Sequence, residues 1–283
     1  MITQEIEFFA PPTLEEAVRL LAEHGDEAKL MGGGMSLMPT MNLGLARPSI
    51  VISLNHVRGL DAIELDGGQL RIGGLVRHYR LASDDLVARH VPLLAEAAKL
   101  IGDPQVRNRG TLGGSIAHAD PAADYLPVMV VTASTVVVTS VRGTREIQAG
   151  DFFVDVLTSA VEIDEVVTEV RIPILGERDG SAYRRLARLE GSFPIVNAAA
   201  IVRGGSHAAQ VAIGGVAGRP VLVDVSASVD ATGRVASEAV AEAASAACAD
   251  AFADLSGDSE YRQAMAGVYA RRAVDAAAAA SAG

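Results

Sequence analysis

Cysteine is almost absent from the sequence, since Cys248 is the only one among 283 residues. A single thiol cannot form a disulfide within the chain. It also cannot supply the four protein ligands that an iron–sulfur cluster or a cysteine-based zinc site needs. The sequence therefore excludes those centres from this chain and predicts a reducing, cytoplasmic location.

Basic residues are outnumbered, and long apolar runs are missing. The chain has 24 Lys and Arg against 35 Asp and Glu, for a net charge of −11. An acidic surface repels phosphate backbones, so nucleic acid is not an expected partner. The most apolar segment, residues 126–141, contains Thr and Ser and is too short to span a membrane, so we interpret it as buried strand. The N-terminus lacks the basic and apolar regions of a signal peptide.

The first part of the chain carries alternating strand and helix signals. Thr13 and Glu16 form a capping box before a helix that Gly25 ends. Apolar patterns predict strands at 28–31, 49–54, 69–74 and 127–141, and helices at 84–90 and 92–101. A turn at 173–180 is typical of a domain boundary. Beyond it, residues 181–225 predict an antiparallel sheet, and the Ala-rich segments 235–253 and 258–280 predict two helices.

Two glycine loops, residues 32–36 and 110–115, are the most informative features. Consecutive glycines let successive backbone N–H groups turn to one side, and they let an anion approach closely. Ser36, Thr111 and Ser115 add hydroxyl donors, so a diphosphate could be held without lysine. Either loop could also be an ordinary tight turn, which is how we interpret the Gly pairs at 67–68, 73–74 and 214–215.

Two familiar nucleotide-binding motifs do not fit these loops. Neither loop is followed by Gly-Lys-Ser/Thr, which a P-loop requires. A dinucleotide-binding Rossmann unit needs glycines that open a long helix, whereas Pro39 follows the first loop within a few residues. A nicotinamide-dependent enzyme of the Rossmann type is therefore disfavoured.

Polar residues follow the second loop closely. His118, Asp120 and Asp124 could form a metal site or an acid–base pair, although no further His stands at ligand spacing. Alternatively, Asp120 starts a turn with the proline that follows it, and Asp124 caps a helix. One of these carboxylates could instead accept hydrogen bonds from sugar or ribityl hydroxyls. The isolated histidines are interpreted as surface or packing residues: His56, His78, His90 and His207.

Four segments then identify a family by resemblance. They are LMGGGMSLMPTMNLGLARP, RNRGTLGGSIAHADPAADYLP, DEVVTEVRIP and ARLEGSFPIVNAAAIV. In this order they resemble the FAD-binding medium subunits of the molybdenum hydroxylases, which include carbon monoxide dehydrogenase and xanthine dehydrogenase. The resemblance implies an α+β fold, with a two-lobed PCMH-type FAD-binding domain followed by a smaller α+β C-terminal domain with an antiparallel sheet. The implied units are 1–56, 57–176 and 177–283.

The resemblance also implies a site. It assigns cofactor contacts to Met31, Gly32, Gly33, Gly34, Met35, Ser36 and Leu37, to Gly110, Thr111, Gly113, Gly114 and Ser115, and to His118, Asp120, Asp124 and Val167. The two glycine loops would hold the pyrophosphate, Asp124 a cofactor hydroxyl, and Val167 an apolar position beside the cofactor. Two departures stand out: Met31 precedes the glycines where the family often has Ala. Phe193 stands where the carbon monoxide branch places a Tyr near the flavin, which weakens carbon monoxide as the substrate.

The implied role is electron relay. FAD in this chain would receive electrons from two 2Fe-2S clusters in a small partner subunit, downstream of a molybdopterin-binding large subunit, and pass them to an external acceptor. The usual assembly is a dimer of heterotrimers, and no catalytic or metal-binding residue is expected in this chain. The alternatives are a self-contained flavin-dependent oxidase and a non-enzymatic nucleotide-binding domain.

Overall fold

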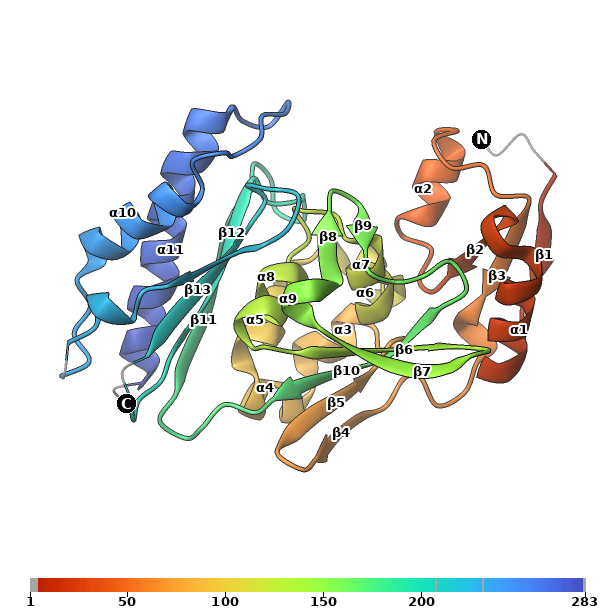
Figure 1. Ribbon diagram of the computed structural model, residues 1–283, viewed down its shortest axis with the longest axis horizontal. Helices are drawn as coiled ribbons and strands as arrows, with labels where there is room; N and C mark the ends of the chain where they lie inside the picture. Colours follow the sequence, from red (N-terminus) through yellow and green to blue (C-terminus); the bar gives the residue numbers. More distant parts are fainter. Residues whose placement is uncertain (1–4, 207, 231, 282–283) are drawn as a thin grey trace.

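The three larger β-sheets follow one another along the long axis of the molecule (Figure 1). The computed structural model describes residues 5–206, 208–230 and 232–281. The N-terminal unit lies at one end, and the C-terminal helices cover the other end (Figure 1). The largest sheet and most of the short helices lie between them. This order agrees with the predicted α+β class and with a C-terminal antiparallel sheet.

The N-terminal unit is a three-stranded parallel sheet in the order β1-β3-β2. Its elements are β1 (Glu7–Phe9), α1 (Leu14–His24), β2 (Ala28–Met31), α2 (Leu37–Asn42) and β3 (Ile50–Ser53). The Thr13 hydroxyl oxygen accepts a hydrogen bond from the Glu16 amide at 3.3 Å, and Gly25 ends α1 with a φ of 52°. Both predicted ends of this helix are confirmed. Its buried face packs on the sheet through Ala17 and Leu21.

The central unit is a five-stranded antiparallel sheet in the order β4-β5-β10-β6-β7. Its strands are β4 (Ile63–Asp66), β5 (Gln69–Gly73), β6 (Thr135–Ser140), β7 (Gly143–Gln148) and β10 (Val166–Pro173). Its helices are α3 (His78–Ser83), α4 (Asp85–His90), α5 (Pro92–Leu100), α6 (Pro104–Arg109), α7 (Leu112–His118), α8 (Tyr125–Val131) and α9 (Ala149–Phe152). A small hairpin of β8 (Phe153–Asp155) and β9 (Thr158–Ser159) follows α9.

The prediction of strand at residues 127–134 is wrong, because most of this run forms helix α8. The helix is buried nearly all round, between the central unit and the C-terminal sheet. A run that is apolar on every side has no periodicity that separates helix from strand. Pro127 stands in the first turn, where a missing N–H group is tolerated. The second half of the run, β6, is a strand as expected.

The C-terminal unit is a four-stranded antiparallel sheet in the order β11-β12-β13-β14. Its elements are β11 (Gly180–Leu186), β12 (Val196–Val202), β13 (Ala209–Gly214), β14 (Val221–Asp224), α10 (Ser237–Ala247) and α11 (Ser259–Ser281). Both predicted helices are present. They cover the outer face of this sheet, while α5 and α8 contact its inner face (Figure 1). Among the described residues, no helix has the length and apolar character that a membrane span requires.

Candidate cofactor site

The two glycine loops touch each other, although about half a domain of sequence separates them. A methyl group on Gly32 would lie 3.0 Å from the Thr111 hydroxyl oxygen, and one on Gly33 would lie 2.7 Å from the Gly110 Cα. The first loop connects β2 to α2, and the second starts between α6 and α7 and includes the first turn of α7. The fold therefore joins the N-terminal unit to the central unit at the two segments that the sequence singled out.

The first loop presents a run of free backbone donors. Within the described part of the chain, the amides of Gly33, Gly34, Met35 and Ser36 donate to no protein acceptor. Gly34 has a φ of 74°, in the left-handed region that glycine tolerates without a Cβ penalty. Successive free amides in such a turn form a concave anion site. The geometry of this loop fits a diphosphate.

The second loop differs, because its amides are used within the protein. The Gly113 amide donates to the Gly74 carbonyl oxygen at 2.9 Å, and the Gly114 amide donates to the Thr111 hydroxyl oxygen at 3.1 Å. The Ser115 amide donates to the Thr111 carbonyl oxygen at 3.0 Å. The second loop can therefore contact a ligand through its hydroxyl groups and leave space for it. The first loop, in contrast, can donate backbone N–H groups. Gly114 is exposed, and the Thr111 hydroxyl is the nearest group to its open side.

Gly73 and Gly74 do form a turn, in which the Val76 amide donates to the Gly73 carbonyl oxygen at 3.0 Å, but they also have a packing role. A methyl group on Gly113 would lie 2.7 Å from the Gly74 carbonyl oxygen, so the two glycines allow a close backbone approach. The Gly74 amide donates to the Thr168 carbonyl oxygen at 2.8 Å, and a methyl group on Gly74 would collide with the Val167 carbonyl oxygen. Val167 is thereby held beside the second loop.

His118 is the last residue of α7, and Asp120 follows two residues later. Seven helical residues span roughly 10 Å, so these side chains are well separated from the loop junction. The Asp120 carboxylate accepts the Ala122 amide at 2.9 Å, which confirms the predicted turn. Among the described residues, no three His, Cys, Asp or Glu side chains gather closely enough to hold a metal ion.

Asp124 has partners that the sequence did not predict. It precedes α8, yet its side chain makes no capping hydrogen bond, so the helix-cap alternative is wrong. Its Oδ1 accepts the Tyr183 hydroxyl at 2.6 Å and the Arg185 guanidinium at 3.0 Å. Both partners come from β11, so this buried cluster joins the central and C-terminal units. Burial raises the pKa of the Asp124 carboxyl, and the charge of Arg185 and the Tyr183 hydrogen bond oppose that shift.

A buried histidine, His78, packs against the start of the second loop. The His78 amide donates to the Gly110 carbonyl oxygen at 3.1 Å, and its Nδ1 is 3.0 Å from the Tyr125 hydroxyl. Burial lowers the pKa of His78 to about 4, with a further contribution from the charges of Arg77 and Arg107. The expected packing role is confirmed for His78. His207 lies outside the described residues.

Arg77 ties the start of the second loop to the segment after β3, and no sequence motif marks it. Its guanidinium donates to the carbonyl oxygen of Arg109, the last residue of α6 and the one before the second loop, and to the Asn55 side-chain oxygen at 2.7 Å, just after β3. The isolated bridge between Arg77 and Thr111 holds the same segments together. Only the tertiary contact identifies this residue.

Phe193 lies in the loop between β11 and β12, and 61% of its surface is exposed. The loop packs against the central unit at Gly191, where a methyl group would lie 2.9 Å from the Gly102 carbonyl oxygen. The loop therefore reaches the central unit just before α6, the helix that leads into the second glycine loop.

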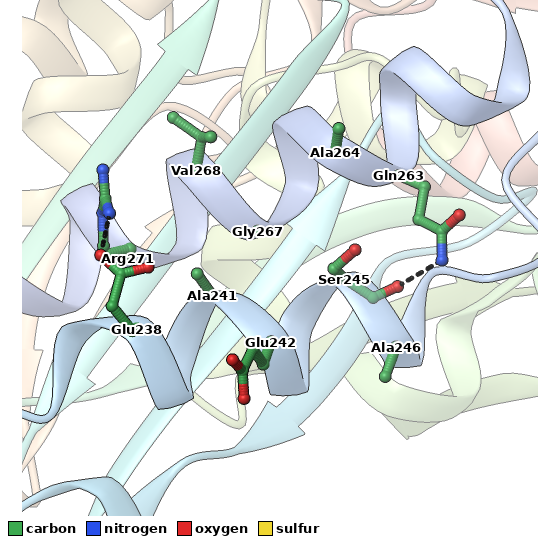
Figure 2. A pocket seen from close by; sticks show the side chains of 10 residues that line it. All are labelled: Glu238, Ala241, Glu242, Ser245, Ala246, Gln263, Ala264, Gly267, Val268 and Arg271. Carbon is green, nitrogen blue, oxygen red and sulfur yellow. Dashed lines mark hydrogen bonds and ion pairs between the residues drawn. The ribbon is translucent and has the colours of Figure 1, made fainter.

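A surface hollow between α10 and α11 lies in the C-terminal unit, on the outer helices of the fold (Figure 2). Its charged residues Glu238 and Arg271 form an ion pair at 2.6 Å, and Gln263 donates to the Ser245 carbonyl oxygen at 3.1 Å. The helices approach closely at Gly267. None of the residues assigned to the cofactor from the sequence lines this hollow, so we place the candidate site at the glycine loops.

The loop geometry defines a candidate diphosphate site, and comparisons with known proteins identify the family. Residues 4–175 match the family described as "FAD binding domain in molybdopterin dehydrogenase". Residues 181–277 match the family described as "CO dehydrogenase flavoprotein C-terminal domain".

Curated relatives extend over the whole chain. The carbon monoxide dehydrogenase medium chain of Hydrogenophaga pseudoflava is 37% identical over 98% of each chain. The nicotine 6-hydroxylase medium subunit of Paenarthrobacter nicotinovorans is 36% identical over 95% of this chain and 96% of the relative. The solved structure of the Hydrogenophaga pseudoflava carbon monoxide dehydrogenase has a TM-score of 0.91 at 37% identity, covering 99% of each chain.

The chain belongs to the FAD-binding medium subunits of the molybdenum hydroxylase family. Its cofactor is FAD, and it is an oxidoreductase subunit.

Proposed function

We propose that this chain relays electrons within a molybdenum hydroxylase. Electrons from substrate oxidation in a molybdopterin-binding large subunit would arrive through the two 2Fe-2S clusters of a small subunit and leave to an external acceptor. FAD supplies the redox chemistry when bound, and the protein supplies its placement and its electrostatic surroundings. The names of the relatives as medium chain and medium subunit support a role inside a larger assembly.

The observation that carries this proposal is the contact of the two glycine loops around free backbone donors. The amides of residues 33–36 would hold the diphosphate, with the Ser36 and Ser115 hydroxyls as further donors. Hydrogen bonds to a charged group contribute roughly 1.5–3 kcal/mol each, so a few of them suffice without lysine. In the described residues, Asp124 Oδ2 accepts no hydrogen bond, which leaves it for a cofactor hydroxyl.

The remaining site residues are proposed with the same roles that the sequence assigned. They are Met31, Gly32 and Leu37 around the first loop, Gly110, Thr111, Gly113 and Gly114 in the second, His118 at the end of α7 with Asp120 just after it, and Val167 as the apolar neighbour. Because these residues extend along α7, they would suit an extended dinucleotide better than a single phosphate.

The assembly and the domain limits are also proposals. We propose a dimer of heterotrimers, with units at 1–56, 57–176 and 177–283. These limits separate the residues of the three main sheets, which end at Ser53, Pro173 and Asp224. The single buried Cys248 supports a reducing, cytoplasmic location.

The test is purification of the full chain with and without its neighbouring subunits. We expect FAD at about one per chain after denaturation, and reduction of the bound flavin by an artificial reductant. We expect the isolated chain to show no turnover of purines, aldehydes, N-heterocycles or carbon monoxide, and the complex to oxidise its own substrate. Substrate oxidation by the isolated chain would contradict the relay and favour the self-contained flavin oxidase.

A further inference from the structure

The Arg77 guanidinium is half-buried at the junction of the two glycine loops, and it has no carboxylate partner among the described residues. It donates only to neutral acceptors, the Arg109 carbonyl oxygen and the Asn55 side-chain oxygen. Burying a charge without a counter-charge is costly, and proteins usually pair such a group. The position of Arg77 therefore requires an explanation.

The charges around Arg77 increase that cost. Burial lowers the pKa of Arg77, and the charge of Arg109 lowers it further, while Asp61 opposes the shift. Arg107 contributes to the same positive region, since its charge acts on the adjacent His78. The local charge around Arg77 is therefore positive, although the net charge of the chain is −11. Local positive charge of this kind is typical of an anion site.

Arg77 is also directly connected to the free amides of the first loop. The Arg109 carbonyl oxygen that accepts its hydrogen bond is the atom against which Gly33 packs. Gly33 begins the run of four amides that have no acceptor among the described residues. A guanidinium has five N–H donors, and two of the Arg77 nitrogens each donate one to the protein, so three donors remain.

We propose that Arg77 binds the diphosphate of FAD and supplies its counter-charge, while its two protein hydrogen bonds, to Arg109 and Asn55, hold the guanidinium in place beside the loop junction. The inference rests on the proposed function and adds a residue to the cofactor site. It explains how an acidic chain without lysine at either loop holds a doubly charged group. It also explains why the loop junction contains a guanidinium that no carboxylate neutralises.

The test compares Arg77→Gln, Arg77→Lys and the control Arg89→Gln in the full chain. Arg89 is exposed in the last turn of α4, so its substitution removes the same charge from the same unit away from the loops. The measurement is the Kd for FAD. It is obtained from flavin fluorescence at each of a series of salt concentrations. A thermal melt of each apoprotein checks that the variant is folded.

We expect Arg77→Gln to weaken FAD binding by ~10- to 100-fold, as the loss of a charged hydrogen bond predicts. Its Kd should also depend less on salt than that of the wild type, because one charge contact is gone. Arg77→Lys should retain the salt dependence with a smaller loss of affinity, and Arg89→Gln should match the wild type.

Two results would overturn the inference. One is a wild-type Kd for Arg77→Gln. The other is a weaker Kd with an unchanged salt dependence, which would make Arg77 only a structural residue that positions the segments around the site. Absence of FAD binding by the wild-type chain and its complex would instead contradict the proposed function, so the two failures can be distinguished.

Discussion

Replacement of Asp124 by Ala tests the cluster that joins the central and C-terminal units. Asp124 Oδ1 accepts hydrogen bonds from both Tyr183 and Arg185. The Arg185 and Asp124 side chains are only 7% and 5% exposed, so the ion pair is shielded from water. Removing the carboxylate leaves the guanidinium buried without a counter-charge.

The expected loss can be worked from these contacts. Breaking a buried ion pair by removing one partner typically costs about 3–5 kcal/mol, compared with about 1 kcal/mol for loss of a helix cap. Since a chain of this size loses about 2–4 °C of Tm per kcal/mol, the apoprotein should melt about 6–20 °C lower. With a total stability near the middle of the usual range of about 5–15 kcal/mol, most molecules of the variant remain folded at low temperature.

The assay combines urea denaturation of the apoprotein with a FAD titration well below the melting temperature. The double variant Asp124→Ala/Arg185→Met removes both charges and should recover part of the lost stability, because no guanidinium is left unpaired. If Asp124 also contacts the cofactor, both variants should bind FAD more weakly. A loss near 1 kcal/mol, or no recovery in the double variant, would refute the reasoning.

Two other predictions concern the second loop and its support. Gly114→Val should greatly reduce the FAD-to-protein ratio, because the side chain would press on the Thr111 hydroxyl and fill the open side of the loop. Ser115→Ala should reduce the ratio less. Equal FAD content in Gly114→Val and wild type would argue against this placement. The pKa of His78 is lowered to about 4 in the folded protein, so His78 is protonated at a higher pH in the unfolded chain than in the folded one. The free energy of unfolding should therefore decrease between about pH 6.5 and 4, by up to about 3 kcal/mol, and a His78→Gln variant that keeps the same slope would contradict that origin.

The sequence by itself determined the local structure and the family. Thr13 and Gly25 mark the ends of α1, because caps act through hydrogen bonds within a few residues. The antiparallel C-terminal sheet and its two helices also follow from local patterns. The glycine loops and the four family segments identified the FAD-binding medium subunits, since these motifs are continuous in the chain.

The tertiary structure decided how distant segments are used. Residues 127–131 are helical because α8 is buried between two units, where an all-apolar run fits either secondary structure. Sequence alone could not show that Gly33 packs on Gly110 or that Arg77 donates to both Arg109 and Asn55. Asp124 similarly pairs with Arg185 across 61 residues. Such contacts depend on which surfaces the packed sheets bring together, and no local pattern encodes the identity of a partner that distant.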